Sequence, residues 1–151
     1  MANFEPRDPD FEAKVRSSFG RQTAMQTLGA VMGKVKAGSV EIEMPYRADL
    51  AQQHGFIHGG IVTAIVDSAC GYAAFSLCAP DTAILTLEYK VNFVAPAKGE
   101  RLLARGEVVR PGATVSVCKG DVLAYENGQE TLVATILTTM MIMPNRPDLA
   151  N

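Results

Sequence analysis

The sequence has few of the residues that most often hold metal ions or form disulfides. It contains only two histidines and three cysteines in 151 residues. The cysteines form no CxxC pair and no cluster with histidine. We therefore expect no metal site and no redox cofactor, and we expect reduced thiols in the core of a cytoplasmic protein.

Blocks of one charge sign are also absent. The formal net charge is −2, and lysine and arginine are scattered along the chain, which argues against nucleic acid as a partner. The first nine residues lack the apolar segment of a secretion signal. A chain of 151 residues with this apolar content is expected to fold as one domain around one core.

One long apolar segment, residues 59–77, contains a single charged residue, Asp67. The segment is long enough for about five helical turns. The charge at its middle, the two glycines at its start and the lack of nearby basic residues argue against a membrane span. We therefore predict a helix that is buried on every face by the rest of the chain.

The segments around this helix have the patterns of shorter helices and strands. Asp10 is expected to cap a helix that Gly20 ends, with a further turn or two at residues 23–28. Residues 85–93 alternate between apolar and polar side chains, which predicts a half-buried strand. Short connections predict antiparallel pairing of the strands, which we place at residues 30–36, 39–46, 85–93, 101–110, 114–125 and 131–143.

This order of elements predicts an α+β fold, in which an antiparallel sheet of about six strands wraps around the long helix. We assign residues 20–143 to that domain. Residues 1–19 are expected to form an N-terminal extension and a helix packed on it, and residues 144–151 a C-terminal tail.

The start of the long helix is suited to binding an oxyanion. Gly59 and Gly60 allow a ligand to approach the backbone, and the first helical turn offers unpaired N–H groups at the positive end of the dipole. Asp67 lies seven residues beyond Gly60, on nearly the same face but about 10 Å along the helix. A second copy of the chain, packed with its helix antiparallel, could bring its own Asp67 to this point, so the sequence suggests a site shared between subunits.

Three sequence features together resemble a known family: a GxxHGG motif that begins at Gly55, an aspartate nine residues after its histidine, and a strand that ends in Phe93-x-Ala95-Pro96-Ala97. Over residues 20–143 the sequence resembles the hotdog-fold acyl-CoA thioesterases of the phenylacetate-degradation (PaaI-like) type. The resemblance implies hydrolysis of acyl-CoA to a free acid and coenzyme A, without a cofactor. It also implies a homodimer joined edge to edge, commonly assembled into a tetramer, with active sites between subunits.

The resemblance also implies roles for individual residues. Asp67 matches the catalytic carboxylate, which acts either as a general base on water or as a nucleophile. The N–H of Gly59, with that of Gly60, matches the group that polarises the thioester carbonyl. His58 matches the histidine that orients the loop and the thioester, and Thr86 matches a hydroxyl that holds the attacking water.

Two further assignments concern residues outside this pattern. Gln52 stands where many relatives have asparagine, and its amide can make the same hydrogen bonds from a longer stem. Arg110 and Lys119 are candidates for binding the phosphates of coenzyme A, although each is better explained as an ordinary solvated surface charge.

Other interpretations of the same residues remain open. Asp67 could be a structural carboxylate, and threonine is favoured in strands whatever the role of Thr86. A non-catalytic acyl-CoA-binding or regulatory hotdog protein is an alternative, which Gln52 supports and Asp67 opposes. A hotdog hydratase or dehydratase would need a catalytic histidine and a carboxylate in other motif settings, which the sequence does not contain.

Overall fold

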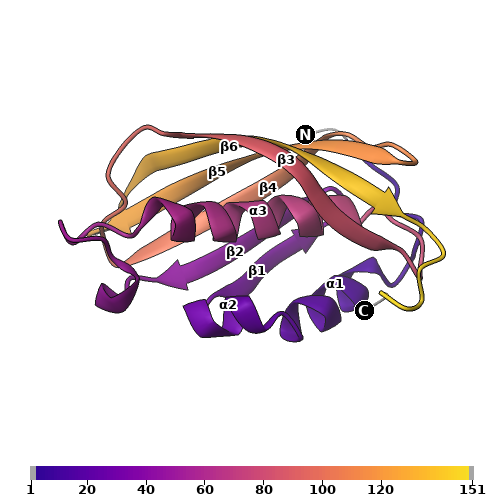
Figure 1. Ribbon diagram of the computed structural model, residues 1–151, viewed down its shortest axis with the longest axis horizontal. Helices are drawn as coiled ribbons and strands as arrows, with labels where there is room; N and C mark the ends of the chain where they lie inside the picture. The colour runs from indigo at the N-terminus through magenta and orange to yellow at the C-terminus, as the bar shows by residue number, and fades with distance from the viewer. Residues whose placement is uncertain (1–2, 150–151) are drawn as a thin grey trace.

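The computed structural model describes residues 3–149, in which an antiparallel sheet of six strands curves around the helix α3 (Gly59–Phe75) (Figure 1). The order across the sheet is β1-β2-β4-β5-β6-β3. The predicted α+β architecture is confirmed. The strands span β1 (Val31–Lys36), β2 (Ser39–Pro45), β3 (Ala83–Phe93), β4 (Arg101–Arg110), β5 (Val115–Glu126) and β6 (Gln129–Met143).

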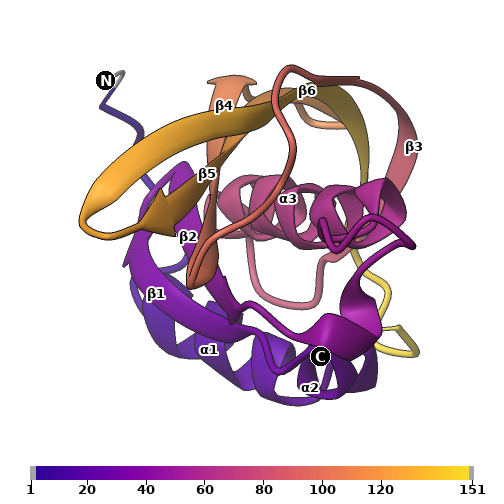
Figure 2. The same ribbon diagram turned by 90° about the vertical axis from the view of Figure 1, so that its left-hand side faces the viewer.

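Two short helices, α1 (Phe11–Gly20) and α2 (Thr23–Leu28), precede the sheet and lie beside β1 (Figure 2). The prediction that Asp10 caps α1 with its side chain is wrong, because that side chain makes no capping bond. Its backbone N–H instead donates to Oδ1 of Asp8 at 3.0 Å. A 3-10 helix, η1 (Ala48–Leu50), lies in the loop that leads to α3.

Helix α3 packs very closely on the middle of the sheet because two strand residues there have no side chain. A Cβ atom added at Gly106 of β4 would lie 2.4 Å from the backbone carbon of Ala69, and one at Gly120 of β5 would lie 2.7 Å from Val66. Both approaches are shorter than carbon atoms tolerate. These glycines therefore set the distance between the helix and the sheet.

One face of α3 is left partly uncovered, so the prediction that this helix is buried on every face is wrong for a single chain. Val62, Ile65, Val66 and Ala69 are fully buried against the sheet. The residues on the opposite side recur at helical spacing, and each is exposed or half-buried. They are Gly60, Ala64, Asp67, Ser68 and Gly71.

Strand β3 forms one edge of the sheet and pairs only with β6. Four of its apolar side chains are exposed rather than half-buried as predicted, with Leu85 at 56 %, Leu87 at 54 %, Tyr89 at 47 % and Phe93 at 53 %, whereas Val91 is half-buried. An edge strand with free backbone groups and exposed apolar side chains is a surface suited to pairing with another chain. Tyr89 is paired in register with Thr138, which is buried. Paired side chains point to the same side of a sheet, so Tyr89 lies on the side that α3 occupies.

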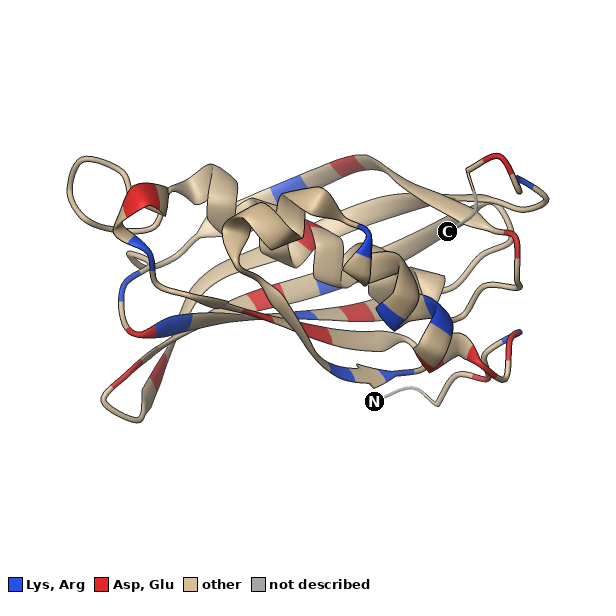
Figure 3. Ribbon diagram, turned by 90° about the horizontal axis from the view of Figure 1, so that it is seen from below, with Lys and Arg blue, Asp and Glu red and all other residues tan. Residues whose placement is uncertain are grey.

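Charged residues are interspersed along the strands rather than gathered by sign (Figure 3). Across β2, β4 and β5, Arg105 pairs with Glu41 at 2.9 Å and Lys119 pairs with Glu107 at 3.3 Å. Such exposed pairs contribute little to stability, but they neutralise the outer surface of the sheet.

The predicted terminal segments are only partly covered by the structure. Residues 1–2 of the predicted extension and 150–151 of the predicted tail lie outside the described residues. Between residues 3 and 149, no helix is long and apolar enough to span a membrane. Cys70, Cys78 and Cys118 are free thiols and all three are buried.

Candidate active site

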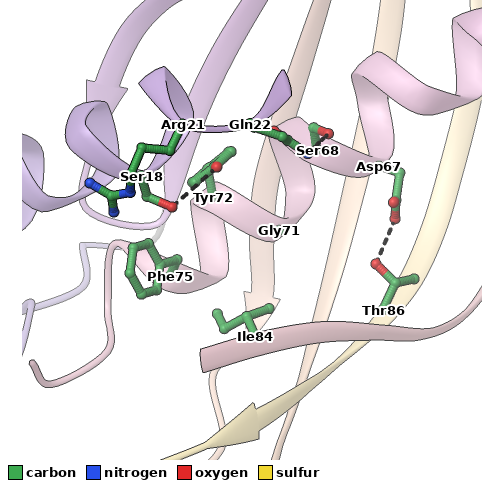
Figure 4. Close-up of a pocket in the computed structure, with 10 residues that line it drawn as sticks. All are labelled: Ser18, Arg21, Gln22, Asp67, Ser68, Gly71, Tyr72, Phe75, Ile84 and Thr86. Atoms are coloured by element: carbon green, nitrogen blue, oxygen red, sulfur yellow. Dashed lines mark hydrogen bonds between the residues drawn. The ribbon is translucent and has the colours of Figure 1, made fainter. Parts of the chain in front are cut away.

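Asp67 lies at a cavity of about 330 Å³ between α3, β3 and the end of α1 (Figure 4). Asp67 and Thr86 face each other on one side of this cavity, and Ser18, Arg21 and Tyr72 lie on the other side. Both polar and apolar groups therefore surround the carboxylate. The lining residues are Ser18, Arg21, Gln22, Asp67, Ser68, Gly71, Tyr72, Phe75, Ile84 and Thr86.

The environment of Asp67 favours a carboxylate that accepts protons more readily than usual. Burial raises its pKa above the ordinary value of 3.8, and the hydrogen bond from Thr86 partly offsets that rise. Oγ1 of Thr86 donates to Oδ1 of Asp67 at 2.9 Å. Over residues 3–149, no cation forms an ion pair with Asp67. A partly desolvated carboxylate without a cation is suited to act as a base or a nucleophile.

The other expected half of the site lies at the start of α3, where His58 is the N-cap. Nδ1 of His58 accepts the N–H of Gly60 at 2.9 Å, which requires the neutral ring to carry its proton on Nε2. The N–H of Gly60 is therefore engaged within the chain. The N–H of Gly59 has no acceptor among residues 3–149, so it is the donor that this helix start leaves free for a ligand.

Gly59 faces a second hollow, of about 440 Å³, which it shares with Gln52 and Phe93. A Cβ atom at position 59 would lie 3.1 Å from Cζ of Phe93, so glycine lets the aromatic ring cover the helix start. The side chain of Gln52 accepts a hydrogen bond from the backbone N–H of His54 through Oε1. Its amide nitrogen is then the group that remains to donate.

The two hollows have no lining residue in common. Asp67 and Gly59 are eight residues apart on one helix, which separates them by about 12 Å along its axis. A single chain therefore brings together Asp67 with Thr86, and Gly59 with Gln52, but it does not bring the carboxylate to the free N–H group.

The predicted phosphate-binding residues lie apart from both hollows. Lys119 is ion-paired with Glu107, and Arg110 is exposed at the end of β4. Neither lines either hollow. The cation that lines the Asp67 cavity is instead Arg21, on the opposite side of that cavity. Sequence reasoning missed it because only the packing of α1 against α3 brings it there. Within residues 3–149, no group of three or more His, Cys, Asp or Glu residues could hold a metal ion.

Comparison with known proteins identifies the family of the chain. Residues 54–131 match the model of the thioesterase superfamily, which covers the GxxHGG motif, α3 and strands β3 to β5. A solved thioesterase family protein from Silicibacter pomeroyi is 50% identical, with a TM-score of 0.88 over 89% of this chain and 98% of that chain.

The chain is also similar to more distant proteins. The PaaI protein from the phenylacetic acid degradation operon of E. coli is 20% identical, with a TM-score of 0.79 over 87% of this chain and 92% of that chain. The 1,4-dihydroxy-2-naphthoyl-CoA hydrolase of Listeria monocytogenes is 23% identical over 61% of this chain and 75% of its own length. The resemblance drawn from the motif is thus confirmed: the chain belongs to the thioesterase superfamily, as a hotdog-fold enzyme of the thioester hydrolase class.

Proposed function

We propose that this protein is an acyl-CoA thioesterase whose active site forms between two subunits. Asp67 of one subunit would act on a thioester whose carbonyl oxygen is bound by the N–H of Gly59 in the other. The observation that carries the proposal is the separation of these two groups into different hollows, about 12 Å apart along the axis of α3. The coenzyme A hydrolase among the relatives supports acyl-CoA as the substrate.

The surfaces beside the two hollows support a dimer of this geometry. The open face of α3 lies beside β3, since Thr86 of β3 donates to Asp67 on that face and Phe93 of β3 covers the start of the helix at Gly59. A partner bound edge to edge along β3 would satisfy its free backbone groups and cover those side chains. With the two α3 helices antiparallel, each Asp67 would approach the partner's helix start. We further propose that such dimers pair into a tetramer in the cytoplasm, where buried thiols stay reduced.

In the general-base form of the reaction, Asp67 removes a proton from water while the water oxygen attacks the thioester carbon. The N–H of Gly59, at the positive end of the helix dipole, stabilises the negative charge that develops on the carbonyl oxygen. The carbon–sulfur bond then breaks, and the proton passes from Asp67 to the leaving sulfur. The products are a carboxylic acid and coenzyme A.

In the nucleophilic form, an oxygen of Asp67 attacks the carbon itself and displaces the thiolate. Water then hydrolyses the resulting anhydride and regenerates the carboxylate. In both forms Thr86 positions the carboxylate through its hydrogen bond, and neither form requires a metal or a redox cofactor. Gln52 would help to hold the thioester beside Gly59.

Release of free thiol from acyl-CoA tests the reaction. The Asp67→Asn variant is expected to lose at least roughly 100-fold in kcat, the scale of general acid–base catalysis, with an unchanged elution volume in size-exclusion chromatography. Near-parental turnover by a folded Asp67→Asn oligomer would contradict the mechanism. Thiol release by the parent also distinguishes a hydrolase from a non-catalytic binding protein, because a binding protein would release negligible thiol before any substitution.

Mixed dimers test the shared site. A chain with Asp67→Asn and a chain with Gly59→Val are each expected to be inactive alone, because each removes one half of every site. Co-expression should restore roughly a quarter of parental activity, since about half of randomly paired dimers are mixed and each has one intact site. If both groups acted within one chain, mixing would restore nothing.

A further inference from the structure

Gly71 occupies the middle of α3, where glycine is unfavourable, and the fold does not require it there. Glycine in a helix interior loses more backbone freedom than alanine. Gly71 does not have the positive φ angle that favours glycine, and a Cβ atom added to it would meet only Cε of Met140, at 4.0 Å. By contrast, a Cβ atom at Gly106 or Gly120 would collide with α3. Packing therefore explains those two glycines but does not explain Gly71.

The position of Gly71 suggests what its missing side chain provides. Gly71 is one helical turn after Asp67, and both line the same cavity. Side chains in a helix tilt toward its N-terminus and cover the residue one turn earlier. Any side chain at position 71 would accordingly extend into the cavity toward the turn that carries Asp67 and reduce the space there.

We propose that Gly71 is a specificity-determining residue, whose missing side chain leaves the space beside Asp67 that the acyl group occupies. This inference rests on the proposed thioesterase function and extends it to the shape of the substrate. The space lies within one turn, roughly 5 Å, of the carboxylate, so it accepts a ring or branch attached close to the carbonyl. Phe75 and Ile84 supply apolar walls to the same cavity.

The far side of the cavity is polar, which limits the length of an apolar acyl group that can bind there. The hydroxyls of Ser18 and Tyr72 are 3.2 Å apart and hydrogen-bonded to each other. The packing of α1 against α3 thus closes the cavity at this end. Compact acyl groups fit this geometry, and a long unbranched chain would have to pass these polar groups.

The test compares kcat/KM for acetyl-, isobutyryl- and benzoyl-CoA in the parent, Gly71→Ala and Gly71→Leu enzymes. Gly71→Ala should keep acetyl-CoA hydrolysis within about twofold and lose about tenfold on benzoyl-CoA, the scale of a small steric change in a pocket. Gly71→Leu should lose roughly 100-fold or more on benzoyl-CoA. The matched control is Gly20→Ala, because Gly20 ends α1, has open space at its Cβ and does not line the cavity.

Measurements of stability and assembly distinguish a change in substrate specificity from a purely structural effect of the substitution. Gly71→Ala should raise the melting temperature by about 2 °C, as expected for a glycine replaced within a helix, while its discrimination against benzoyl-CoA increases. An unchanged ratio of benzoyl- to acetyl-CoA hydrolysis, an equal loss on all three substrates, or dissociation of the oligomer would overturn the inference. A parent active only on acetyl-CoA would also overturn it. A parent that hydrolyses none of these thioesters would instead overturn the proposed function, and the inference with it.

Discussion

The hydrogen bond between Thr86 and Asp67 leads to a prediction about the pH dependence of hydrolysis. Thr86→Val retains the branched shape of the side chain and removes the hydroxyl that donates to Asp67. Burial already raises the pKa of Asp67 above 3.8, and this hydrogen bond opposes the rise. Without the bond, the ionised carboxylate loses a stabilising partner, and the pKa of Asp67 rises further.

The size of the shift follows from the strength of such bonds. A hydrogen bond to a charged group contributes about 1.5–3 kcal/mol when well shielded. Asp67 is only partly buried, so water replaces part of the lost bond. We therefore expect the ionised carboxylate to lose roughly half of the lower energy, or somewhat more, in Thr86→Val. At about 1.4 kcal/mol per pKa unit, the shift is about 0.5–1 unit upward.

The assay is the pH profile of kcat/KM for an acyl-CoA. Asp67 must be ionised to act as a base or nucleophile, so activity falls as pH decreases through its pKa. The acid limb of the parent should therefore lie above pH 3.8. The limb of Thr86→Val should move to higher pH by about 0.5–1 unit, and that of Thr86→Ser, which retains the donor, should stay near the parental position. An acid limb of Thr86→Val that is unmoved or moved to lower pH would refute this reasoning.

Two further predictions concern the packing of α3, and chemical denaturation of each variant measures them. Gly106→Ala places a methyl group 2.4 Å from the backbone of Ala69 and should lower the free energy of unfolding by about 1–3 kcal/mol or more; parental stability would mean that the helix can move away freely. Ser76→Ala removes the buried acceptor that holds the N–H of Gly38 at 2.8 Å and should cost about 1–3 kcal/mol. Ser76→Thr, which keeps the hydroxyl, is its control, and an equal loss in both variants would assign the effect to packing instead.

Much of the fold could be predicted because local patterns specify local structure. The apolar segment that starts at two glycines became α3, and the alternating segments became strands with bounds close to those expected. The Asn127-Gly128 pair, a hairpin signal, adopts φ values of 51° and 76° between β5 and β6, as a tight turn of this type requires.

The candidate site was predictable only in part. The motif pointed to Gly59, Gly60 and Asp67 as candidates, and helical geometry predicted that Gly60 and Asp67 lie on nearly one face but too far apart for one small substrate. The sequence did not predict that His58 engages the N–H of Gly60, or that Thr86 donates to the carboxylate itself. The bond from Thr86 joins two separate elements, so it depends on angles and distances that no local pattern encodes.

The sequence by itself determined which segments are helix or strand and where the chain turns, because these depend on neighbours along the chain, and its motif named the residues that we propose carry the chemistry. Only the tertiary structure decided that β3 lies at the sheet edge with several apolar side chains exposed, that one face of α3 stays open, and that Arg21 lines the same cavity as Asp67. Burial and proximity depend on which distant segments pack together. An alternating strand has the same pattern whether its apolar side meets its own core or awaits a second chain.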